Sequence, residues 1–377
     1  MSRRARSLDA LLVLALLGIA VAAIVNVVQS GGDRETVPSP PVEQAPSPTV
    51  STETTETAAE LPSLLPLPGV LREEGGVLWW SDARCRAGSL ELASGAVVSF
   101  PAAHCRLWPA PDGSVAVALS ARRSDALEGR GLVLARDRRG EDEVVLGHSP
   151  GFLGSELSWN PFGSTFAVCF ETRRGAVVDV IAPGQTIGTL EGACSPAWLS
   201  DGQLAVARSS PLSIEVDRRV VLDRKEVAEL LPSVPRGATR AVSALGAGDG
   251  RVVAGLVVVS GKRLLPYTAS LVVLTDSGEI EFTAQLSPDT LPAAVGLSPD
   301  GRALWYFDAG ERTAAIIAVP GGSRLLPFGA RWLAWSPDGR YLAAATGEGI
   351  VISSWPDGDR VAEVPVVAND VSWSRSP

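Results

Sequence analysis

The 377-residue chain carries 33 Lys and Arg residues against 42 Asp and Glu residues, a formal net charge of -9. This balance argues against nucleic acid as the main partner, because binding to phosphates needs clustered basic side chains. With 38 Gly, 28 Pro and a single Met, the composition favours many short strands over long helices.

The segment from Ala10 to Val28 is a nearly unbroken apolar run, interrupted only by Asn26. As a helix it would span roughly 28 Å, about the thickness of a hydrocarbon core. Three arginines lie in the nine residues before it, so the positive-inside rule leaves the N-terminus in the cytoplasm. We therefore expect a cytoplasmic tail at 1–9, a transmembrane signal-anchor helix at 10–28 and an extracytoplasmic C-terminal domain.

A cleaved signal peptide is the alternative, since Ala20-Val21-Ala22 resembles a cleavage site. Both interpretations export the rest of the chain. Residues 29–63, rich in Pro, Thr and Glu, lack the apolar content needed to fold. We expect them to form a disordered linker between the anchor and a folded domain at 64–377.

One hairpin repeats through that domain. In Trp332–Ala345, two short apolar runs flank Ser-Pro-Asp-Gly, a sequence typical of a tight turn. Copies of this pattern occur at Arg106–Leu119, Leu157–Val168, Pro196–Ala207, Ala241–Ala254 and Val295–Tyr306. They recur roughly every 40 to 50 residues, with two more strand-like runs after the hairpin, as in four-stranded propeller blades.

The two ends of the domain complement each other. Asn369–Pro377 repeats the first strand of the hairpin and then stops, whereas Gly76–Asp82, Gly88–Leu92 and Ala96–Phe100 supply three strands with no first. We therefore expect the C-terminal strand to join the N-terminal blade and close the ring. The predicted fold is an all-β propeller of about seven four-stranded blades, with six or eight as alternatives because one unit, Thr239–Leu286, is weak.

The motif resembles the TolB-like and WD40-like β-propeller repeats of exported bacterial proteins. The resemblance is strongest at Ser298–Arg302 and Ser336–Arg340, and it is partial elsewhere, since Phe162 stands where Asp is expected. It implies a propeller fold but carries no set of catalytic residues. With the anchor expected at 10–28, we expect a single-pass protein of the bacterial cell membrane.

Four cysteines form two pairs at similar repeat positions. Cys85 follows a second strand and Cys105 begins the next first strand, and Cys169 and Cys194 stand in a comparable relation. In an exported protein this arrangement predicts disulfides Cys85–Cys105 and Cys169–Cys194. No Cys-x-x-Cys spacing supports a metal site instead.

Two sets of repeated residues have structural interpretations. The first is an aspartate before the turn glycine, which we expect to bond the local backbone: Asp112, Asp201, Asp249, Asp300 and Asp338. The second is a tryptophan at one repeat position, which we expect to pack between blades: Trp108, Trp159, Trp198, Trp335 and Trp373. The alternative for the tryptophans is that some line the mouth of the central channel and bind a ligand.

No catalytic, cofactor-binding or metal-binding motif is visible. The two histidines, His104 and His148, are expected in loops. The leading hypothesis is a non-enzymatic binding or scaffold module, tethered to the membrane by its one helix, that contacts a protein or cell-envelope component through one rim. The alternative is a hydrolase or lyase acting on glycans or peptides in the channel, with carboxylates such as Glu171, Asp179 or Asp217.

Overall fold

The computed structural model describes residues 63–100, 103–120, 131–135, 143–148, 152–172, 175–182, 185–261, 263–321, 324–325 and 329–376. The expected cytoplasmic tail and transmembrane helix, and all but the last residue of the expected linker, lie outside these ranges. Within the described ranges, neither helix has the length and apolar content needed to cross a membrane.

The described chain forms seven antiparallel sheets, one with five strands and six with four. The first contains β1 (Ser63–Leu64), β2 (Val77–Ser81), β3 (Ala87–Glu91), β4 (Ala96–Ser99) and β29 (Asp370–Ser374). The second contains β5 (His104–Pro109), β6 (Ala116–Ser120), β7 (Gly131–Ala135) and β8 (Glu143–His148). The third contains β9 (Phe152–Trp159), β10 (Phe166–Thr172), β11 (Gly175–Ala182) and β12 (Gln185–Glu191).

The fourth sheet contains β13 (Ala193–Trp198), β14 (Leu204–Ser209), β15 (Leu212–Val216) and β16 (Arg219–Leu222). The fifth contains β17 (Thr239–Gly248), β18 (Arg251–Ser260), β19 (Arg263–Thr275) and β20 (Ile280–Gln285). The sixth contains β21 (Pro292–Leu297), β22 (Ala303–Asp308), β23 (Thr313–Ala318) and β24 (Arg324–Leu325). The seventh contains β25 (Trp332–Trp335), β26 (Tyr341–Ala345), β27 (Ile350–Ser354) and β28 (Arg360–Val364). The predicted all-β architecture of four-stranded antiparallel units is confirmed.

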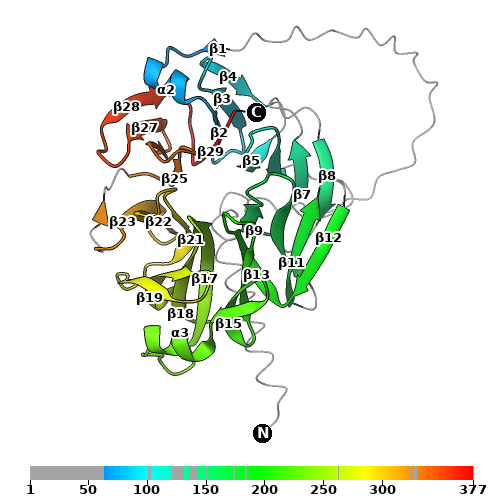
Figure 1. The fold of residues 1–377 in the computed structure, drawn as a ribbon, viewed down its shortest axis with the longest axis vertical. Helices are drawn as coiled ribbons and strands as arrows, with labels where there is room; N and C mark the ends of the chain where they lie inside the picture. Colours follow the sequence, from blue (N-terminus) through cyan, green and yellow to red (C-terminus); the bar gives the residue numbers. More distant parts are fainter. Residues whose placement is uncertain are drawn as a thin grey trace, which may run out of the picture.

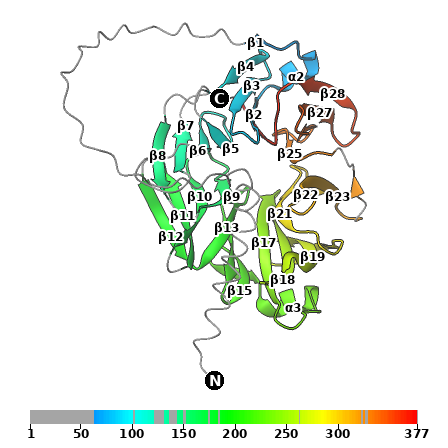
Figure 2. The same ribbon diagram turned by 180° about the vertical axis from the view of Figure 1, so that it is seen from behind.

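The first sheet joins the two ends of the described chain. Its strand order is β1-β4-β3-β2-β29, and β29 pairs with β2 from Val77 opposite Ser374 to Ser81 opposite Asp370. The C-terminal strand therefore stands in the place that the sequence predicts for it. Figures 1 and 2 show the seven sheets following one another around the molecule in chain order, with β29 returning to β2.

One edge strand of each sheet lies toward the middle, and we name these the inner strands: β29, β5, β9, β13, β17, β21 and β25. Neighbouring inner strands are bridged by polar contacts. The Trp159 indole N–H donates to the carbonyl of Trp108 at 2.8 Å, and the Ser158 hydroxyl accepts from the Trp198 backbone at 3.0 Å. Across the gap from the sixth to the seventh sheet, the rings of Trp305 and Trp332 meet at 5.2 Å between centroids.

Two short helices interrupt the strands, and neither was expected. Helix α2 (Gly69–Glu74) precedes β2, and α3 (Arg224–Leu230) follows β16. Helix α3 begins with a capping box, in which the Asp223 side chain accepts from the Lys225 and Glu226 backbones while Glu226 accepts from the Asp223 backbone. The Asp-x-x-Glu spacing is a sequence pattern typical of a helix N-terminus. Both helices bury one apolar residue, Leu71 and Val227 respectively.

The unit that is weakest in sequence has the longest strands. In the fifth sheet β18 has 10 residues and β19 has 13, and all of β18 after Arg251 is buried. A strand buried on both faces is a continuous Val-rich run rather than an alternating one. The degenerate turn motif therefore made this unit appear weaker in the sequence than it is in the structure.

The turn glycines pack against the turn of the preceding sheet. All have positive φ, as an Asp-Gly turn requires: Gly113, Gly163, Gly202, Gly250, Gly301 and Gly339. A Cβ on Gly113 would lie 2.3 Å from the carbonyl oxygen of Arg375, and one on Gly339 would lie 3.3 Å from Pro299. Gly250 differs, since nothing lies within 4 Å of its Cβ position. We name the end of the molecule formed by these turns the Asp-Gly rim.

Gly113 and Gly250 form a matched pair, because both have a φ of 68° and only Gly113 meets a neighbouring sheet. We expect Gly250→Ala to lower the free energy of unfolding by about 1 to 2 kcal/mol, the cost of the left-handed conformation. Gly113→Ala should cost a further ~1 to 3 kcal/mol, because the new methyl group clashes with the Arg375 backbone. Urea unfolding measures both, and equal losses would contradict the contact between the turn and the residues after β29.

Both predicted disulfides are present, and each joins neighbouring sheets. Cys85, in the turn after β2, is bonded to Cys105 of β5, and Cys169 of β10 is bonded to Cys194 of β13. Cys105 and Cys194 are each the second residue of an inner strand. The ends of the inner strands opposite the Asp-Gly rim thus carry the disulfides, and we name this end the disulfide rim.

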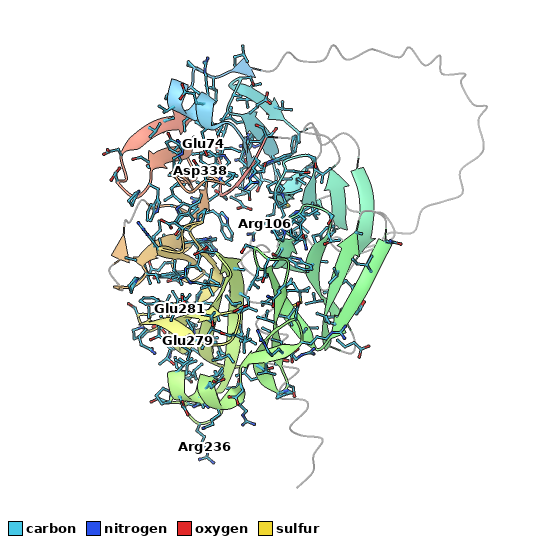
Figure 3. The ribbon with its side chains drawn as sticks, in the orientation of Figure 1. Glu74, Arg106, Arg236, Glu279, Glu281 and Asp338 are labelled. Carbon is cyan, nitrogen blue, oxygen red and sulfur yellow. A yellow bond between two sulfur atoms is a disulfide. The ribbon has the colours of Figure 1, made fainter. Side chains whose placement is uncertain are left out.

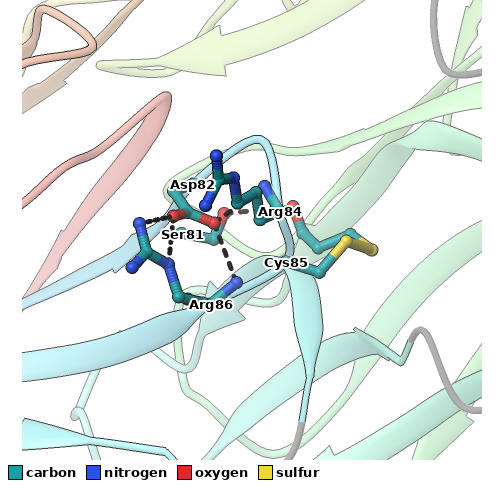
Figure 4. The surroundings of a disulfide bond; sticks show 6 residues. Ser81, Asp82, Arg84, Cys85 and Arg86 are labelled. Atoms are coloured by element: carbon teal, nitrogen blue, oxygen red, sulfur yellow. Dashed lines mark hydrogen bonds and ion pairs between the residues drawn. A yellow bond between two sulfur atoms is a disulfide. The ribbon is translucent and has the colours of Figure 1, made fainter. Parts of the chain in front are cut away.

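A buried carboxylate organises the turn that holds Cys85 (Figure 4). Asp82 is 4% exposed and accepts hydrogen bonds from the backbones of Arg84 and Arg86 at 2.8 and 2.9 Å. It also pairs with the Arg86 guanidinium, at 2.6 Å from Nε. These contacts fix the turn and leave Arg84 exposed beside the disulfide.

The two disulfides close loops of similar length, with sequence separations of 20 and 25 residues. Because the stabilisation depends on the entropy of loop closure, we expect it to be similar for both. Replacing either pair by serine should lower the free energy of unfolding by about 3 kcal/mol. Thermal unfolding of the two double variants, beside the reduced and oxidised parent, measures this loss. Non-reducing peptide mapping of the parent is the control, and free thiols at the four positions would refute the pairing.

Candidate functional site

A cavity of about 360 Å³ occupies the middle of the molecule, within the range of small-ligand sites. All seven inner strands contribute residues to its lining. The lining is mostly small aliphatic side chains and indole rings, with three serines and one arginine. Figure 3 shows that arginine, Arg106, near the middle of the molecule.

Most of the repeated tryptophans both pack against neighbouring strands and line the cavity. The cavity is lined by Trp108, Trp198, Trp335 and Trp373. The same side chains pack between strands: Trp335 meets Trp355 edge-on at 5.5 Å, and Trp373 stacks on Tyr341 of the seventh sheet at 6.5 Å. Trp159 does not line the cavity, and it packs on Phe166 instead, at 5.0 Å. Trp305 and Trp332 also line it and had not been singled out.

Arg106 is the distinctive group of the cavity, and no motif in the sequence pointed to it. Its Nε lies 3.2 Å from a carboxylate oxygen of Asp370, on β29. The guanidinium carbon lies over two indole rings, 4.2 Å from the centroid of Trp332 and 5.0 Å from that of Trp108. Each stacked ring contributes a cation–π attraction that increases when the pair is removed from water.

Burial dominates the electrostatics of this ion pair. The Arg106 and Asp370 side chains are 18% and 14% exposed. Burial lowers the pKa of Arg106, and the Asp370 carboxylate opposes that shift. Burial likewise raises the pKa of Asp370, against the opposing effect of Arg106. Removing one partner would therefore leave an uncompensated charge, which is more costly than losing the pair.

The ion pair lies near the disulfide rim. Arg106 directly follows Cys105, and Asp370 is the first residue of β29, opposite Ser81 at the end of β2. The Ser81 hydroxyl donates to the Cys105 carbonyl at 3.0 Å, which ties the first sheet to β5. The disulfide and this hydrogen bond hold the backbone from which Arg106 extends.

The repeated aspartates lie away from the cavity, at the Asp-Gly rim. In each of four turns the carboxylate accepts from the backbone N–H two residues later, at 2.9 to 3.1 Å: Asp112, Asp201, Asp300 and Asp338. Asp249 instead accepts from the Arg251 guanidinium at 3.0 Å. None of the five lines the cavity, so this set does not form a carboxylate ring there.

Asp338 has a second role, because it belongs to a charged cluster that fixes α2 (Figure 3). Arg340 pairs with both Asp338 and Glu74, the last residue of α2. Burial opposes ionisation of Asp338, but the Arg340 backbone and guanidinium and the Ser336 hydroxyl lower its pKa well below the usual range. Burial, and then the neighbouring Asp338, raise the pKa of Glu74.

Of the carboxylates proposed for an enzyme, the two whose side chains are described, Asp179 and Asp217, do not line the cavity. Asp179 accepts from the Thr189 hydroxyl at 2.6 Å within the third sheet, and Asp217 accepts from the Leu204 backbone at 3.1 Å within the fourth. The Glu171 side chain lies outside the described side chains. In the described part of the chain, no group of three or more His, Cys, Asp and Glu side chains could hold a metal ion.

The loop predictions for the histidines were wrong. His104 is the first residue of β5, is fully buried and packs edge-on against Phe100 at 6.0 Å. His148 is the last residue of β8. The Gly-His-Ser-Pro sequence around His148 and the disulfide cysteine beside His104 suggested loops, but pairing with the adjacent strands determined the backbone.

No family model matches the chain, and no curated protein matches it. Solved structures do. A functionally unknown protein from Desulfotomaculum acetoxidans DSM 771 aligns at a TM-score of 0.47 with 12% identity, over 80% of this chain and 99% of that one. Kuenenia stuttgartiensis hydrazine synthase aligns at 0.46 with 15% identity, over 71% of this chain and 88% of that one.

Asp338→Asn should lower the free energy of unfolding by about 1 kcal/mol at pH 7, since a charge-assisted turn bond is weakened. The pKa of Asp338 is lower in the folded than in the unfolded protein, so its carboxylate stabilises the fold at pH values above the unfolded-state pKa. This stabilisation is lost as the pH falls toward the folded-state pKa. The difference between parent and variant should therefore shrink below about pH 4. Urea unfolding across the acid range measures it.

Glu74→Gln is the matched control in the same cluster. The pKa of Glu74 is raised, so its ionisation opposes folding and the neutral variant should be at least as stable as the parent at pH 7. A loss of stability in Glu74→Gln as large as in Asp338→Asn would contradict these opposite directions.

Proposed function

We propose that this chain is a membrane-tethered, extracytoplasmic β-propeller of the TolB-like and WD40-like type that binds a protein or cell-envelope component at its disulfide rim. In this proposal the seven sheets are the blades of a closed ring, and the ring is a non-enzymatic binding module. The residues at 10–28 are its single membrane anchor and 29–63 its flexible tether.

Two observations support a closed ring. A single central cavity takes lining residues from all seven inner strands, as expected when blades surround one axis. The last strand completes the first sheet by pairing with β2, which removes an open sheet edge that could otherwise recruit another chain.

The disulfides support an oxidising compartment, since such bonds persist outside the cytosol. The apolar run at 10–28 with arginines before it supports an anchor at the cytoplasmic membrane of a bacterium.

One observation carries the binding role: a central cavity lined by indole rings around a single arginine. Tryptophan and arginine dominate the energetics of recognition sites. The position of Arg106 beside Cys105 favours the disulfide rim as the side of contact. At the opposite rim the Asp-Gly turns pack on one another and use their carboxylates on their own backbone.

Photo-crosslinking from the two rims tests this proposal. A benzophenone amino acid replaces Arg84, exposed beside the Cys85–Cys105 disulfide, or Phe162, which is 72% exposed in a turn of the Asp-Gly rim. In intact cells we expect a discrete crosslinked product from position 84 and none from position 162. A product from position 162 alone would refute the choice of rim, and no product from either position would refute the binding role.

A further inference from the structure

The charge of the cavity indicates the kind of chemical group that it accepts. Arg106 is the only charged residue among the described residues that line it. Its guanidinium stays protonated at neutral pH. Within the described part of the chain, its Nε lies 3.2 Å from Asp370 without forming a hydrogen bond, and no acceptor receives a hydrogen bond from the guanidinium. Two donors of a rigid fork are thus left to the cavity.

The fork is held in place before any ligand arrives. Trp332 and Trp108 cover the guanidinium at 4.2 and 5.0 Å, and the Asp370 carboxylate lies 3.2 Å from its Nε. Because the donors are already oriented, little side-chain entropy is lost when an anion binds them. Around the fork most lining residues are indole or aliphatic, with three serines among them, so the walls offer rings and methyl groups to the apolar body of a ligand.

We propose that this cavity binds a monoanionic carboxylate carried on an apolar body, with the two carboxylate oxygens accepting from the Nη atoms of Arg106. This inference rests on the proposed binding function and specifies its ligand. A planar carboxylate matches the guanidinium fork in a bidentate pair. The apolar body lies against the indole rings of the lining.

The single cation decides between a monoanion and a dianion. Asp370 already offsets part of the Arg106 charge, and no second cation lines the described cavity. A carboxylate adds one negative charge to the Arg106–Asp370 pair, and the guanidinium is shared between two carboxylates. A phosphate dianion would add two negative charges beside the same single cation, at a larger desolvation cost.

The carboxylate has two sources with the same chemistry, a free organic acid or the C-terminus of a peptide. Two pairs of probes separate these sources. N-acetyl-phenylalanine and its amide, N-acetyl-phenylalaninamide, represent the free organic acid. The peptide Ala-Ala-Ala-Ala-Phe, with a free or an amidated C-terminus, represents the chain terminus. Phenyl phosphate is the dianionic probe. Calorimetry and tryptophan fluorescence on the full-length chain in mild detergent measure affinity, with detergent alone as the blank.

Two variants test the ion pair. Asp370→Asn removes the competing carboxylate and should tighten carboxylate binding about threefold to tenfold, from the electrostatics of one neighbouring charge. Arg106→Gln with Asp370→Asn removes both charges without leaving one unpaired, and should weaken binding about tenfold or more. If this double variant fails to fold, the single variant Arg106→Lys takes its place. It keeps the ion pair but loses the guanidinium fork, and it should also weaken carboxylate binding.

We expect each free carboxylate that binds to bind more tightly than its amide. Binding of only the acid identifies a small-molecule ligand, and binding of the free peptide identifies a chain terminus. Equal affinity of acid and amide, tighter binding of phenyl phosphate, or weaker carboxylate binding by folded Asp370→Asn would each overturn the proposal. None of these outcomes affects crosslinking at the disulfide rim, which tests the binding role by itself.

Discussion

The pairing of β29 with β2 is the interaction on which the rest of the site depends. It places Asp370 at the start of an inner strand, where its carboxylate faces Arg106 of β5. Without that strand, the Arg106 guanidinium would be a buried cation with no counter-charge, a costly arrangement in an apolar surrounding. The same pairing brings Trp373 to the cavity wall. Sheet completion and cavity chemistry therefore share one set of hydrogen bonds.

The two rims of the molecule have different physical characters. At the Asp-Gly rim, glycines without side chains let neighbouring turns approach closely, and aspartates are occupied by their own backbone. At the disulfide rim, covalent links fix the starts of β5 and β13. The turns of the Asp-Gly rim are thus held by close packing, whereas two disulfides link neighbouring sheets at the other end. Arg106 lies at the disulfide rim, and no other unit of the repeat has an arginine at its position.

The repeat allowed much of the fold to be read from the sequence, because turn chemistry and spacing recur in every unit. The cysteine pairs were readable for the same reason: Cys105 and Cys194 occupy one repeat position. The Arg106–Asp370 pair could not be read this way, since it joins residues far apart in the chain and departs from the repeat. The fifth sheet was underestimated because burial on both faces removes the alternation of β18. Helix α3 was missed although its capping box was visible.

The arrangement of the covalent links has a consequence for how the molecule matures. Each disulfide joins sheets that are consecutive along the chain, the first to the second and the third to the fourth. Neither link holds β29, whose attachment to β2 depends on backbone hydrogen bonds and packing. Because a chain is made from its N-terminus, β5 and its arginine emerge long before β29. Oxidation can therefore secure the early sheets while the cavity is still unfinished, and the cavity wall is completed only when the last strand pairs with β2.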